Sequence, residues 1–483
     1  MSSAIMETKA TDNITLKLQP AAILSRQRQA FMQSGAPVIG ERREDIRRLR
    51  DAVRQQAPRV AAAISADFGN RSVQETMVAD IWPVLSSARH TLDHLASWMK
   101  PKRVSVGLEL LPGRARLLYQ PVGVVGIISP WNYPFQIAIV PLIAALAAGN
   151  RAMLKPSELT PRTSEFLAEF LDKLFPQEKV ATVLGGPETG AAFASLPFDH
   201  LFYTGSTSVG RRIMRAAAEN LTPVTLELGG KSPCVVGEDG VSPATAQSVA
   251  FGKLLNAGQT CIAPDYALVP QARREDFIGL ISQAITRLYP SLRGNPDYTS
   301  IVNDRHYDRV TGLLDEARRR GVRIVEINPA NEALPPAERK LAPCLLIDPP
   351  DDLAVMREEI FGPILPILSY DGLDQAIEHI NSRPRPLALY YYGSREADRD
   401  KVLSRTVSGG ASINETLMHI VVENLPFGGI GPSGMGAYHG EYGFQTFSHR
   451  KGVFLQSRIN GSSILRPPFG RAANAMLRFM LNR

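Results

Sequence analysis

Cysteine is scarce in this sequence: Cys234, Cys261 and Cys344 are its only three cysteines among 483 residues. Three such widely spaced cysteines cannot build a disulfide framework or a zinc knuckle. We therefore expect a reducing, cytoplasmic location and no metal site. A composition that is 44% hydrophobic and 21% charged is typical of a globular protein rather than a disordered one.

Long apolar runs are also missing. The longest, "IAIVPLIAALAAG" from Ile137, spans 13 residues and contains Pro141, whereas a membrane-spanning helix needs about 20 apolar residues. The N-terminus carries Glu7 and Asp12 and lacks the apolar core of a signal peptide. We predict a buried helix from Ile137 and no membrane span.

The net charge of +7 does not come from a basic block. Segments such as "RREDIRRLRDAVRQQ" and "DEARRRGVR" mix bases with acids at helical spacing, which is typical of solvated helix faces. No nucleic-acid-binding motif accompanies them. The expected partner is a small molecule, and a mild excess of base helps to attract an anionic cofactor.

Hydrophobic periodicity divides the chain into regions. Residues 20–99 have helical periodicity, and "KPKRVSVGLELLPGRARLLYQP" predicts a hairpin around "LPGR". Short apolar runs then alternate with helical segments, first between residues 122 and 227 and again from "KSPCVVGED" to "RPLALYYYG". This alternation predicts an α/β fold with doubly wound parallel sheets. The closing "GRAANAMLRFMLNR" predicts a basic amphipathic helix that docks onto the protein's own surface.

Cys261 stands in "NAGQTCIAPDY", where polar residues and a glycine precede it. A cysteine placed for packing usually has apolar neighbours, because free cysteine behaves as a small hydrophobe. The local sequence leaves both a reactive thiol and an inert buried thiol open.

Two glycine-bearing segments are candidates for a phosphate loop. In "FYTGSTSVGRRIM", Gly205 and Ser206 join a predicted strand to a predicted helix, whose first N–H groups attract phosphate. A strand–helix turn without function would look similar. The strict G-x-G-x-x-G match, residues 429–434, follows no strand and opens no helix, so we interpret it as a tight structural or substrate-side loop.

Charged residues follow or interrupt two predicted strands. In "MLKPSELTP", Lys155 and Glu158 can bind ribose hydroxyls, or can belong to a solvated turn with a helix cap at Ser157 or Thr160. In "VTLELGGKSP", Glu227 lies inside an apolar strand, where desolvation would raise its pKa and suit a general base. A salt bridge from Glu227 to a nearby lysine, Lys231, is the structural alternative.

Two further motifs carry candidate residues. Pro130 and Pro134 stiffen "SPWNYPF", so that the Asn132 amide is preorganised to donate to an oxyanion, although a plain aromatic turn explains the motif nearly as well. "REEIFGPILP" offers Glu359 and Phe361 before a Gly-Pro pair.

Together these motifs, in this order and spacing, resemble the aldehyde dehydrogenase superfamily from about residue 23 to residue 452. "NAGQTCIAPDY" and "LPFGGIGPSGMGAYHGEYGFQTFSHRK" are typical of its class 3 branch. Within that branch the length and the "RPPFGR" tail are most similar to bacterial coniferyl-aldehyde dehydrogenases.

The resemblance implies roles for the candidate residues. Cys261 would be the nucleophile, Glu227 the general base and Asn132 an oxyanion donor. The residues implied in cofactor binding are Lys155 and Glu158 at the adenosine ribose, Gly205 and Ser206 beside the pyrophosphate, Glu359 and Phe361 at the nicotinamide riboside, and also Trp131 and Leu228. A nearby cationic nicotinamide would lower the pKa of the thiol.

The resemblance also implies an architecture and a reaction. Residues 20–98 and 120–227 would bind the cofactor, 228–425 would form a catalytic domain, 99–119 and 440–460 an oligomerisation arm of a homodimer, and 461–483 a tail. The implied reaction oxidises an aldehyde with NAD, and possible NADP use, to the acid through a thiohemiacetal and a thioester. An aromatic substrate such as coniferyl aldehyde, or a long-chain aldehyde, is expected, with Tyr133, Phe135 and Phe427 as candidate tunnel residues.

Two other functions stay open at this point. The first is a cysteine-dependent thioester hydrolase or acyl transferase with a vestigial nucleotide site. The second is a non-catalytic binding protein of the same fold, against which intact Cys261, Glu227 and Asn132 argue.

Overall fold

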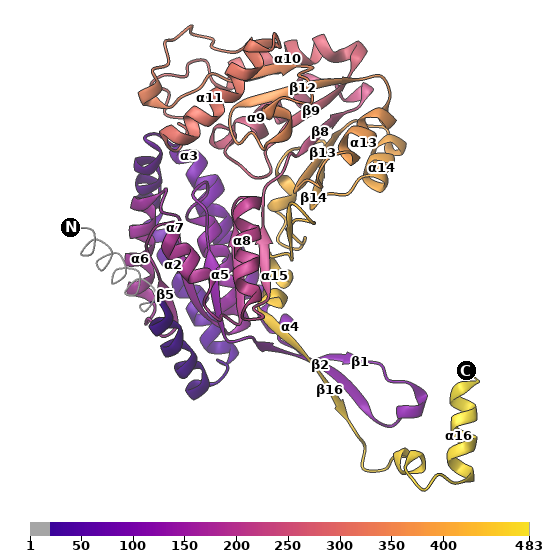
Figure 1. The fold of residues 1–483 in the computed structure, drawn as a ribbon. Helices are drawn as coiled ribbons and strands as arrows, with labels where there is room; N and C mark the ends of the chain where they lie inside the picture. Colours follow the sequence, from indigo (N-terminus) through magenta and orange to yellow (C-terminus); the bar gives the residue numbers. More distant parts are fainter. Residues whose placement is uncertain (1–19, 483) are drawn as a thin grey trace, which may run out of the picture.

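The computed structural model describes residues 20–482, whose strands form three separate sheets (Figure 1). Segment 1–19, for which the sequence predicts no signal peptide, lies outside the described residues. Two of the sheets are mainly parallel and are flanked by helices. The prediction of an α/β fold with doubly wound parallel sheets is confirmed.

Helices dominate the first hundred residues, as predicted. A helix over residues 20–34 is followed by α2 (Ile39–Phe68), α3 (Val73–Thr76), a π-helical turn (Met77–Ile81) and α4 (Trp82–Trp98). Apolar residues at three- and four-residue spacing give α2 one buried face, which carries Ile46, Leu49, Val53, Val60 and Ile64. Helix α2 packs against α5 (Gln136–Ala148) and α6 (Pro161–Leu174).

The six-stranded sheet has the order β15-β7-β6-β3-β4-β5, with β15 alone antiparallel. Its strands are β3 (Val124–Ile128), β4 (Arg151–Lys155), β5 (Val180–Thr182), β6 (His200–Thr204), β7 (Val224–Glu227) and β15 (Gly434–Met435). The helices between its parallel strands are α5 (Gln136–Ala148), α6 (Pro161–Leu174), α7 (Pro187–Ala194) and α8 (Thr207–Ala218). Helix α5 is almost wholly buried, which confirms the helix predicted from Ile137.

The seven-stranded sheet has the order β10-β11-β12-β9-β8-β13-β14, with β10 alone antiparallel. Its strands are β8 (Pro233–Val236), β9 (Tyr266–Pro270), β10 (Arg323–Glu326), β11 (Cys344–Ile347), β12 (Ile364–Tyr370), β13 (Ala388–Tyr392) and β14 (Gly410–Ile413). Its longer helices are α9 (Pro243–Leu254), α10 (Arg274–Leu288), α11 (Asp304–Arg319), α13 (Leu373–Asn381) and α14 (Glu396–Arg405).

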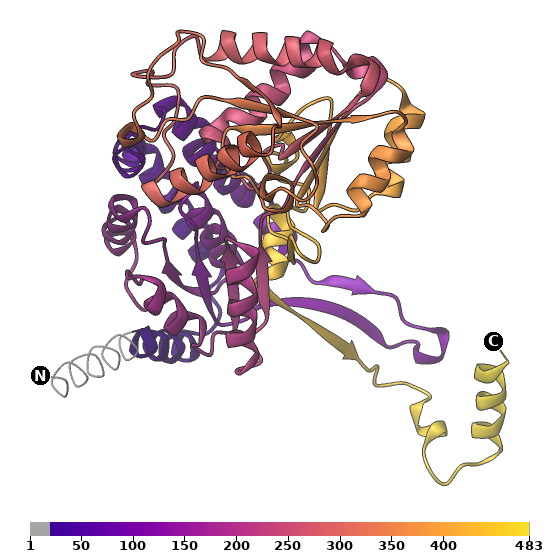
Figure 2. The same ribbon diagram turned by 45° about the horizontal axis from the view of Figure 1, so that its top comes forward.

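A three-stranded antiparallel arm projects from the body (Figures 1 and 2). It joins the predicted hairpin, β1 (Lys102–Val104) and β2 (Arg114–Pro121), to β16 (Ser448–Leu455) near the end of the chain. Just before β16, helix α15 (Gly440–Thr446) packs on α4 and α5 in the body.

The C-terminal helix α16 (Arg471–Leu481) lies beyond the tip of this arm (Figure 2). Ala473 is its one buried residue, so the prediction that this helix docks onto the protein's own surface was wrong for the single chain. Its larger apolar side chains, Leu477, Phe479, Met480 and Leu481, are exposed to solvent. Within residues 20–482, every helix falls short of the length and apolarity that crossing a bilayer requires.

Candidate active site

The backbone before Cys261 is held in an unusual conformation. After α9, Asn256, Ala257 and Gly258 have φ values of 54°, 51° and 77°, a left-handed region that L-residues seldom adopt in succession. A Cβ on Gly258 would lie 2.3 Å from the carbonyl oxygen of Gly362. The glycine thus permits contact between the Cys261 loop and the loop that follows Glu359 and Phe361.

Hydrogen bonds tie the Cys261 loop to the "PWNY" loop. Asn132 Nδ2 donates to the carbonyl oxygen of Gln259 at 3.1 Å, and Asn256 Nδ2 donates to the carbonyl oxygen of Asn132 at 3.0 Å. The hydroxyls of Tyr133 and Thr260 are 2.5 Å apart. The side chain of Asn132 is therefore fixed next to the residues that precede the cysteine.

Glu227 ends strand β7 as a buried residue, and neither carboxyl oxygen has a hydrogen-bond partner. Burial raises the pKa of Glu227 well above its ordinary value. The alternative of a salt bridge to Lys231 was wrong, because Lys231 pairs with Asp265 and also donates to the carbonyl oxygens of Val355 and Glu358.

The loop of residues 429–434 supports this strand. Strand β15 pairs Gly434 with Glu227, and Leu228 N donates to the carbonyl oxygen of Ser433 at 3.0 Å. Gly431 and Gly434 also pair with each other across the turn. These contacts agree with the interpretation of the G-x-G-x-x-G match as a tight structural loop.

The ends of β4 and β6 carry the candidate ribose and phosphate residues. Lys155 Nζ lies 2.8 Å from Glu158 Oε2, with the lysine buried and the glutamate 36% exposed at its side chain. Ser206 caps α8 by accepting from Val209 N at 3.4 Å. A Cβ on Gly210 would meet Leu228 Cδ2 at 2.7 Å, so glycine allows α8 to pack closely on the end of β7.

The capping alternative for "KPSELTP" is only partly right. Thr160 occupies the N-cap position of α6, but its side chain makes no capping hydrogen bond. Instead Asp67, at the end of α2, accepts from the N–H groups of Arg162 and Thr163 at 2.9 Å each. Sequence spacing gives no sign of a cap supplied from 95 residues upstream.

Glu359 and Phe361 face the Cys261 loop from the other side. A Cβ on Gly229 would lie 2.0 Å from Glu359 Oε2, so the "LELGG" glycine leaves room for this carboxyl group. Burial, with Asp265 adding to it, raises the pKa of Glu359 to about 8. The rings of Phe361 and Trp131 meet edge to face, with their centroids 5.4 Å apart. The ring centroid of Trp131 also lies 4.8 Å from that of His306, a neighbour that the sequence did not predict.

These residues fit an anionic dinucleotide. The first N–H groups of a helix lack intrahelical partners and attract phosphate, and α8 presents them next to Gly205 and the exposed Ser206. The Lys155–Glu158 pair supplies a donor and an acceptor for ribose hydroxyls at the end of the neighbouring strand β4. Because Gly229 has no side chain, the carboxyl group of Glu359 can lie against the end of the "LELGG" segment.

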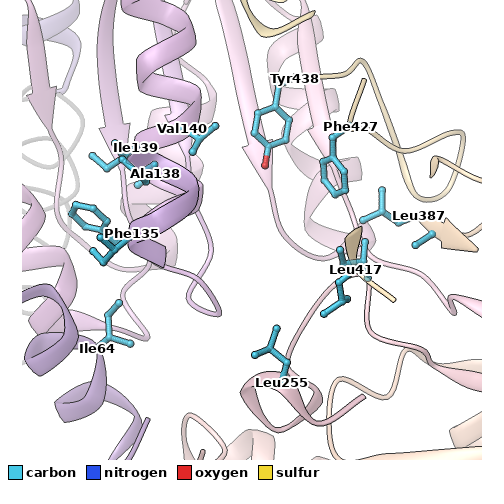
Figure 3. Packing of buried hydrophobic residues seen from close by; sticks show 14 of the residues in the cluster. Ile64, Phe135, Ala138, Ile139, Val140, Leu255, Leu387, Leu417, Phe427 and Tyr438 are labelled. Carbon is cyan, nitrogen blue, oxygen red and sulfur yellow. The ribbon is translucent and has the colours of Figure 1, made fainter. Parts of the chain in front are cut away.

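Cys261 and Glu227 line one largely apolar cavity of about 250 Å³. Its wall includes two of the predicted aromatic residues, Tyr133 and Phe427. Phe135 was wrongly predicted to line it: its ring packs on Phe166 and Phe170 in the core. Figure 3 shows Phe427 beside Leu387 and Leu417, and Phe135 apart from them near Ile64. Tyr133 and Phe135 are only two residues apart in the chain, yet one lines the cavity and the other packs in the core.

The protein's own groups disfavour ionisation of the Cys261 thiol. The residue as a whole is half-buried, yet its sulfur is desolvated, and burial followed by the charges of Glu359 and Glu227 raises the pKa of Cys261 to about 12. Backbone hydrogen bonds from Cys261 and Ile262 lower the pKa of the thiol, but by less than burial and the two carboxylates raise it. The further lowering that the resemblance implies would come from a bound cationic nicotinamide.

Sequence reasoning missed several polar residues of this region. Gln259 holds Asn132, while Tyr438 and Glu423 line the cavity wall. Arg71, which donates to the carbonyl oxygen of Asn132 at 2.8 Å, stands in "DFGNRS". Nothing in that segment distinguishes this arginine from the many surface arginines of the chain.

A model of the aldehyde dehydrogenase family matches residues 18–453. A relative named probable coniferyl aldehyde dehydrogenase, from Caulobacter vibrioides, is 48% identical over 461 residues, which cover 94% of this chain and 95% of the relative. The solved substrate-bound state of AldH from Staphylococcus aureus has a TM-score of 0.90 at 38% identity, over 95% of this chain and 99% of that one. The NAD⁺ complex of an aldehyde dehydrogenase from Bacillus cereus has a TM-score of 0.80 at 27% identity, over 91% and 89%.

Proposed function

The chain belongs to the aldehyde dehydrogenase family, and from this premise we propose that it oxidises aromatic aldehydes to acids through a thioester on Cys261. The observation that carries the proposal is the shared cavity: Cys261 and Glu227 line it together, and Asn132 is fixed beside the cysteine loop.

Cys261 acts as the nucleophile. Its sulfur attacks the aldehyde carbon, and the carbonyl oxygen becomes the oxyanion of a thiohemiacetal. One N–H of the Asn132 amide is held by Gln259, which leaves its other N–H, with the backbone N–H of Cys261, to stabilise that oxyanion. Because the pKa of the free thiol is raised, the proton must leave when the site is loaded with a cation or when a nearby carboxylate accepts it.

Glu227 acts as the general base for hydrolysis. Loss of hydride from the thiohemiacetal carbon leaves a thioester, and a water molecule must then be deprotonated to attack it. Glu227 accepts this proton, and the products are the carboxylic acid and the free thiol of Cys261. An unpaired, desolvated carboxylate with a raised pKa accepts a proton more readily than an ordinary exposed carboxylate does.

A nicotinamide cofactor, when bound, supplies the acceptor for the hydride. We assign its adenosine ribose to Lys155 and Glu158, its pyrophosphate to Gly205, Ser206 and the start of α8, and its nicotinamide riboside to Glu359 and Phe361, with Trp131 and Leu228 adjoining. Glu158 repels a 2′-phosphate, so NAD is preferred and NADP is accepted more weakly.

The aromatic substrate class is supported by the cavity and by the relatives. The cavity wall is largely apolar and includes Tyr133, Phe427 and Tyr438, which suit a planar aromatic body. The relative from Caulobacter vibrioides carries the name of a coniferyl aldehyde enzyme. Coniferyl aldehyde is therefore the first substrate to test.

The larger organisation follows from the same assignment. The unit around the six-stranded sheet binds the cofactor, and residues 228–425 carry the nucleophile. The arm of β1, β2 and β16 leaves edge strands and apolar side chains such as Val104 and Phe454 exposed. Such an edge is suited to pairing with a second copy of the chain in a homodimer.

A panel of aromatic, long-chain and short aldehydes, assayed separately with NAD and NADP at 340 nm (a wavelength near the NADH maximum), tests the function. We expect coniferyl aldehyde to give a higher kcat/KM than acetaldehyde, and NAD a higher one than NADP. Cleavage of an ester or thioester without any cofactor reduction by aldehydes would instead favour a thioester hydrolase or acyl transferase. Cofactor binding without turnover of any aldehyde would favour a binding protein.

A further inference from the structure

A fully buried ion pair lies behind the "PWNY" loop. Arg71 follows α2, Asp80 lies in the π-helical turn, and neither side chain is accessible to solvent. Arg71 Nη2 and Asp80 Oδ2 are 3.0 Å apart, as an ion pair that lacks the alignment of a hydrogen bond. Burying two charges has a large desolvation penalty, and such a pair is weak evidence for stability alone. Its remaining contacts indicate what else it does.

Both members of the pair bind the same short loop. Arg71 Nη1 donates to the carbonyl oxygen of Asn132 at 2.8 Å, and its guanidinium lies over the ring of Tyr133, 4.7 Å from the centroid. Asp80 Oδ1 accepts from Gln136 N at 3.0 Å and from Phe135 N at 3.3 Å. The pair therefore fixes residues 132–136 from both ends, including the N–H groups at the start of α5 that have no intrahelical partner.

The residue at the centre of this arrangement is Asn132. Its carbonyl oxygen accepts from Arg71 and also from Asn256 Nδ2 at 3.0 Å, while its own amide donates to Gln259, two residues before Cys261. The main chain of Asn132 is thus held by a charged donor, and its side chain by the nucleophile loop. A displacement of about 1 Å in such a group can slow a reaction about a hundredfold.

We propose that the Arg71–Asp80 pair is a positioning device that fixes the Asn132 amide relative to Cys261 for the first chemical step, without touching the substrate or the cofactor. The proposal rests on the oxyanion role of Asn132 proposed above. Arg71 is suited to this because its planar fork can bind a carboxylate and a carbonyl oxygen together, which a lysine cannot do with the same geometry.

Arg42 offers a matched control. It is also a buried arginine, and it also holds carbonyl oxygens: Nη1 donates to Ala147 and Nε donates to Pro37, each at 2.9 Å. It supports the C-terminal end of α5, whereas Arg71 and Asp80 support its N-terminal end. Loss of Arg42 removes a buried arginine from the same helix without touching the Asn132 loop.

The test compares Arg71→Lys, the double substitution Arg71→Met with Asp80→Asn, and Arg42→Met. For each, NAD binding stoichiometry and Kd, Tm, and the single-turnover rate constant for NADH formation with enzyme in excess over aldehyde are measured. Arg71→Lys retains the charge that Asp80 needs, so the comparison stands even if the double variant does not fold. We expect both Arg71 variants to bind one NAD per chain with Kd within about twofold of the wild type, and the rate constant to fall about ten- to a hundredfold.

Arg42→Met should lower Tm while leaving the single-turnover rate constant within about twofold of the wild type. A merely structural role for Arg71 would give the same pattern as Arg42: fewer NAD-binding chains, each reacting at the wild-type rate. That result would overturn the proposal.

An Asn132→Ala background separates this proposal from the one it rests on. If Arg71 acts through Asn132, Arg71→Lys should change the rate constant less than about twofold in that background. An undiminished Arg71 effect there would overturn the positioning role while leaving the proposed function intact. If Asn132→Ala itself reacts at the wild-type rate, the oxyanion assignment fails, and the positioning proposal fails with it.

Discussion

The two polar regions next to Cys261 are built in opposite ways. On one side, Asn132, Gln259 and Asn256 form a closed set of hydrogen bonds, backed by Arg71 and Asp80. On the other, Glu227 is equally buried but has no hydrogen-bond partner at either oxygen. This contrast agrees with the proposed roles, in which Asn132 must keep one orientation and Glu227 must exchange a proton.

The largest effect should come from removing the sulfur between these two regions. Cys261→Ala should abolish dehydrogenase activity, because neither region has an alternative nucleophile, while the Kd for NAD stays within about twofold of the wild type. The steady-state rate of NADH formation measures the activity, and a titration with NAD measures the Kd. Retention of a tenth of the wild-type turnover would contradict the assignment.

The second prediction concerns Glu227, the carboxyl group that has no hydrogen-bond partner. Glu227→Gln should allow one round of hydride loss and then slow thioester hydrolysis, by about a hundredfold or more, because an amide cannot accept the proton of water. Stopped-flow traces should show a burst of NADH followed by slow turnover. A steady-state rate equal to that of the wild type would remove Glu227 from the reaction.

A smaller effect is expected at the rim of the cofactor site. Glu158→Gln removes the charge that opposes a 2′-phosphate, while Lys155 remains to meet it, so the ratio of NAD to NADP binding should fall about tenfold. Titrations of the wild type and the variant with each cofactor give this ratio. An unchanged ratio would show that Glu158 does not contact the adenosine ribose.

The smallest expected effect is a pH-dependent difference in thermal stability between the wild type and Glu227→Gln. Because burial raises the pKa of Glu227, the folded chain keeps a proton that the unfolded chain loses above about pH 4.5. The wild type therefore loses stability as the pH rises from that value towards the folded pKa, and the Gln variant does not. The Tm of Glu227→Gln minus that of the wild type should be close to zero near pH 4.5 and grow by a few degrees towards neutral pH.

A Tm difference that stays constant between pH 5 and 8 would mean that Glu227 is not desolvated as the structure shows. Glu359, whose pKa is raised to about 8, is present in both proteins and cancels from the difference.

The sequence predicted most of the strands and helices because parallel strands buried on both faces have continuous apolar runs, such as Val124–Ile128. It did not mark β12, in which Pro366 pairs with Leu346 in the middle of a sheet, a position where proline is unusual. It wrongly placed Phe135 in the cavity, since a pattern cannot tell which side of a loop turns inward.

Some residues of the candidate site could be predicted from the sequence, and others could not. Cys261, Glu227 and Asn132 could be named as candidates because their segments have a polarity or glycine content that is unusual for packing, and the family resemblance then implied their roles. Arg71, Asp80 and Asp67 were missed, because their partners are 61, 55 and 96 residues away in the chain. Only the fold shows that these residues share a contact.

The most direct test of the account is the mass of the Glu227→Gln enzyme after mixing with NAD and coniferyl aldehyde. If Cys261 forms a thioester that Glu227 helps to hydrolyse, the intact protein should gain the mass of one acyl group. Digestion should then place that group on the peptide containing Cys261, and Cys261→Ala should abolish it. An acyl group on another residue, or NADH formation without any covalent adduct, would contradict the account.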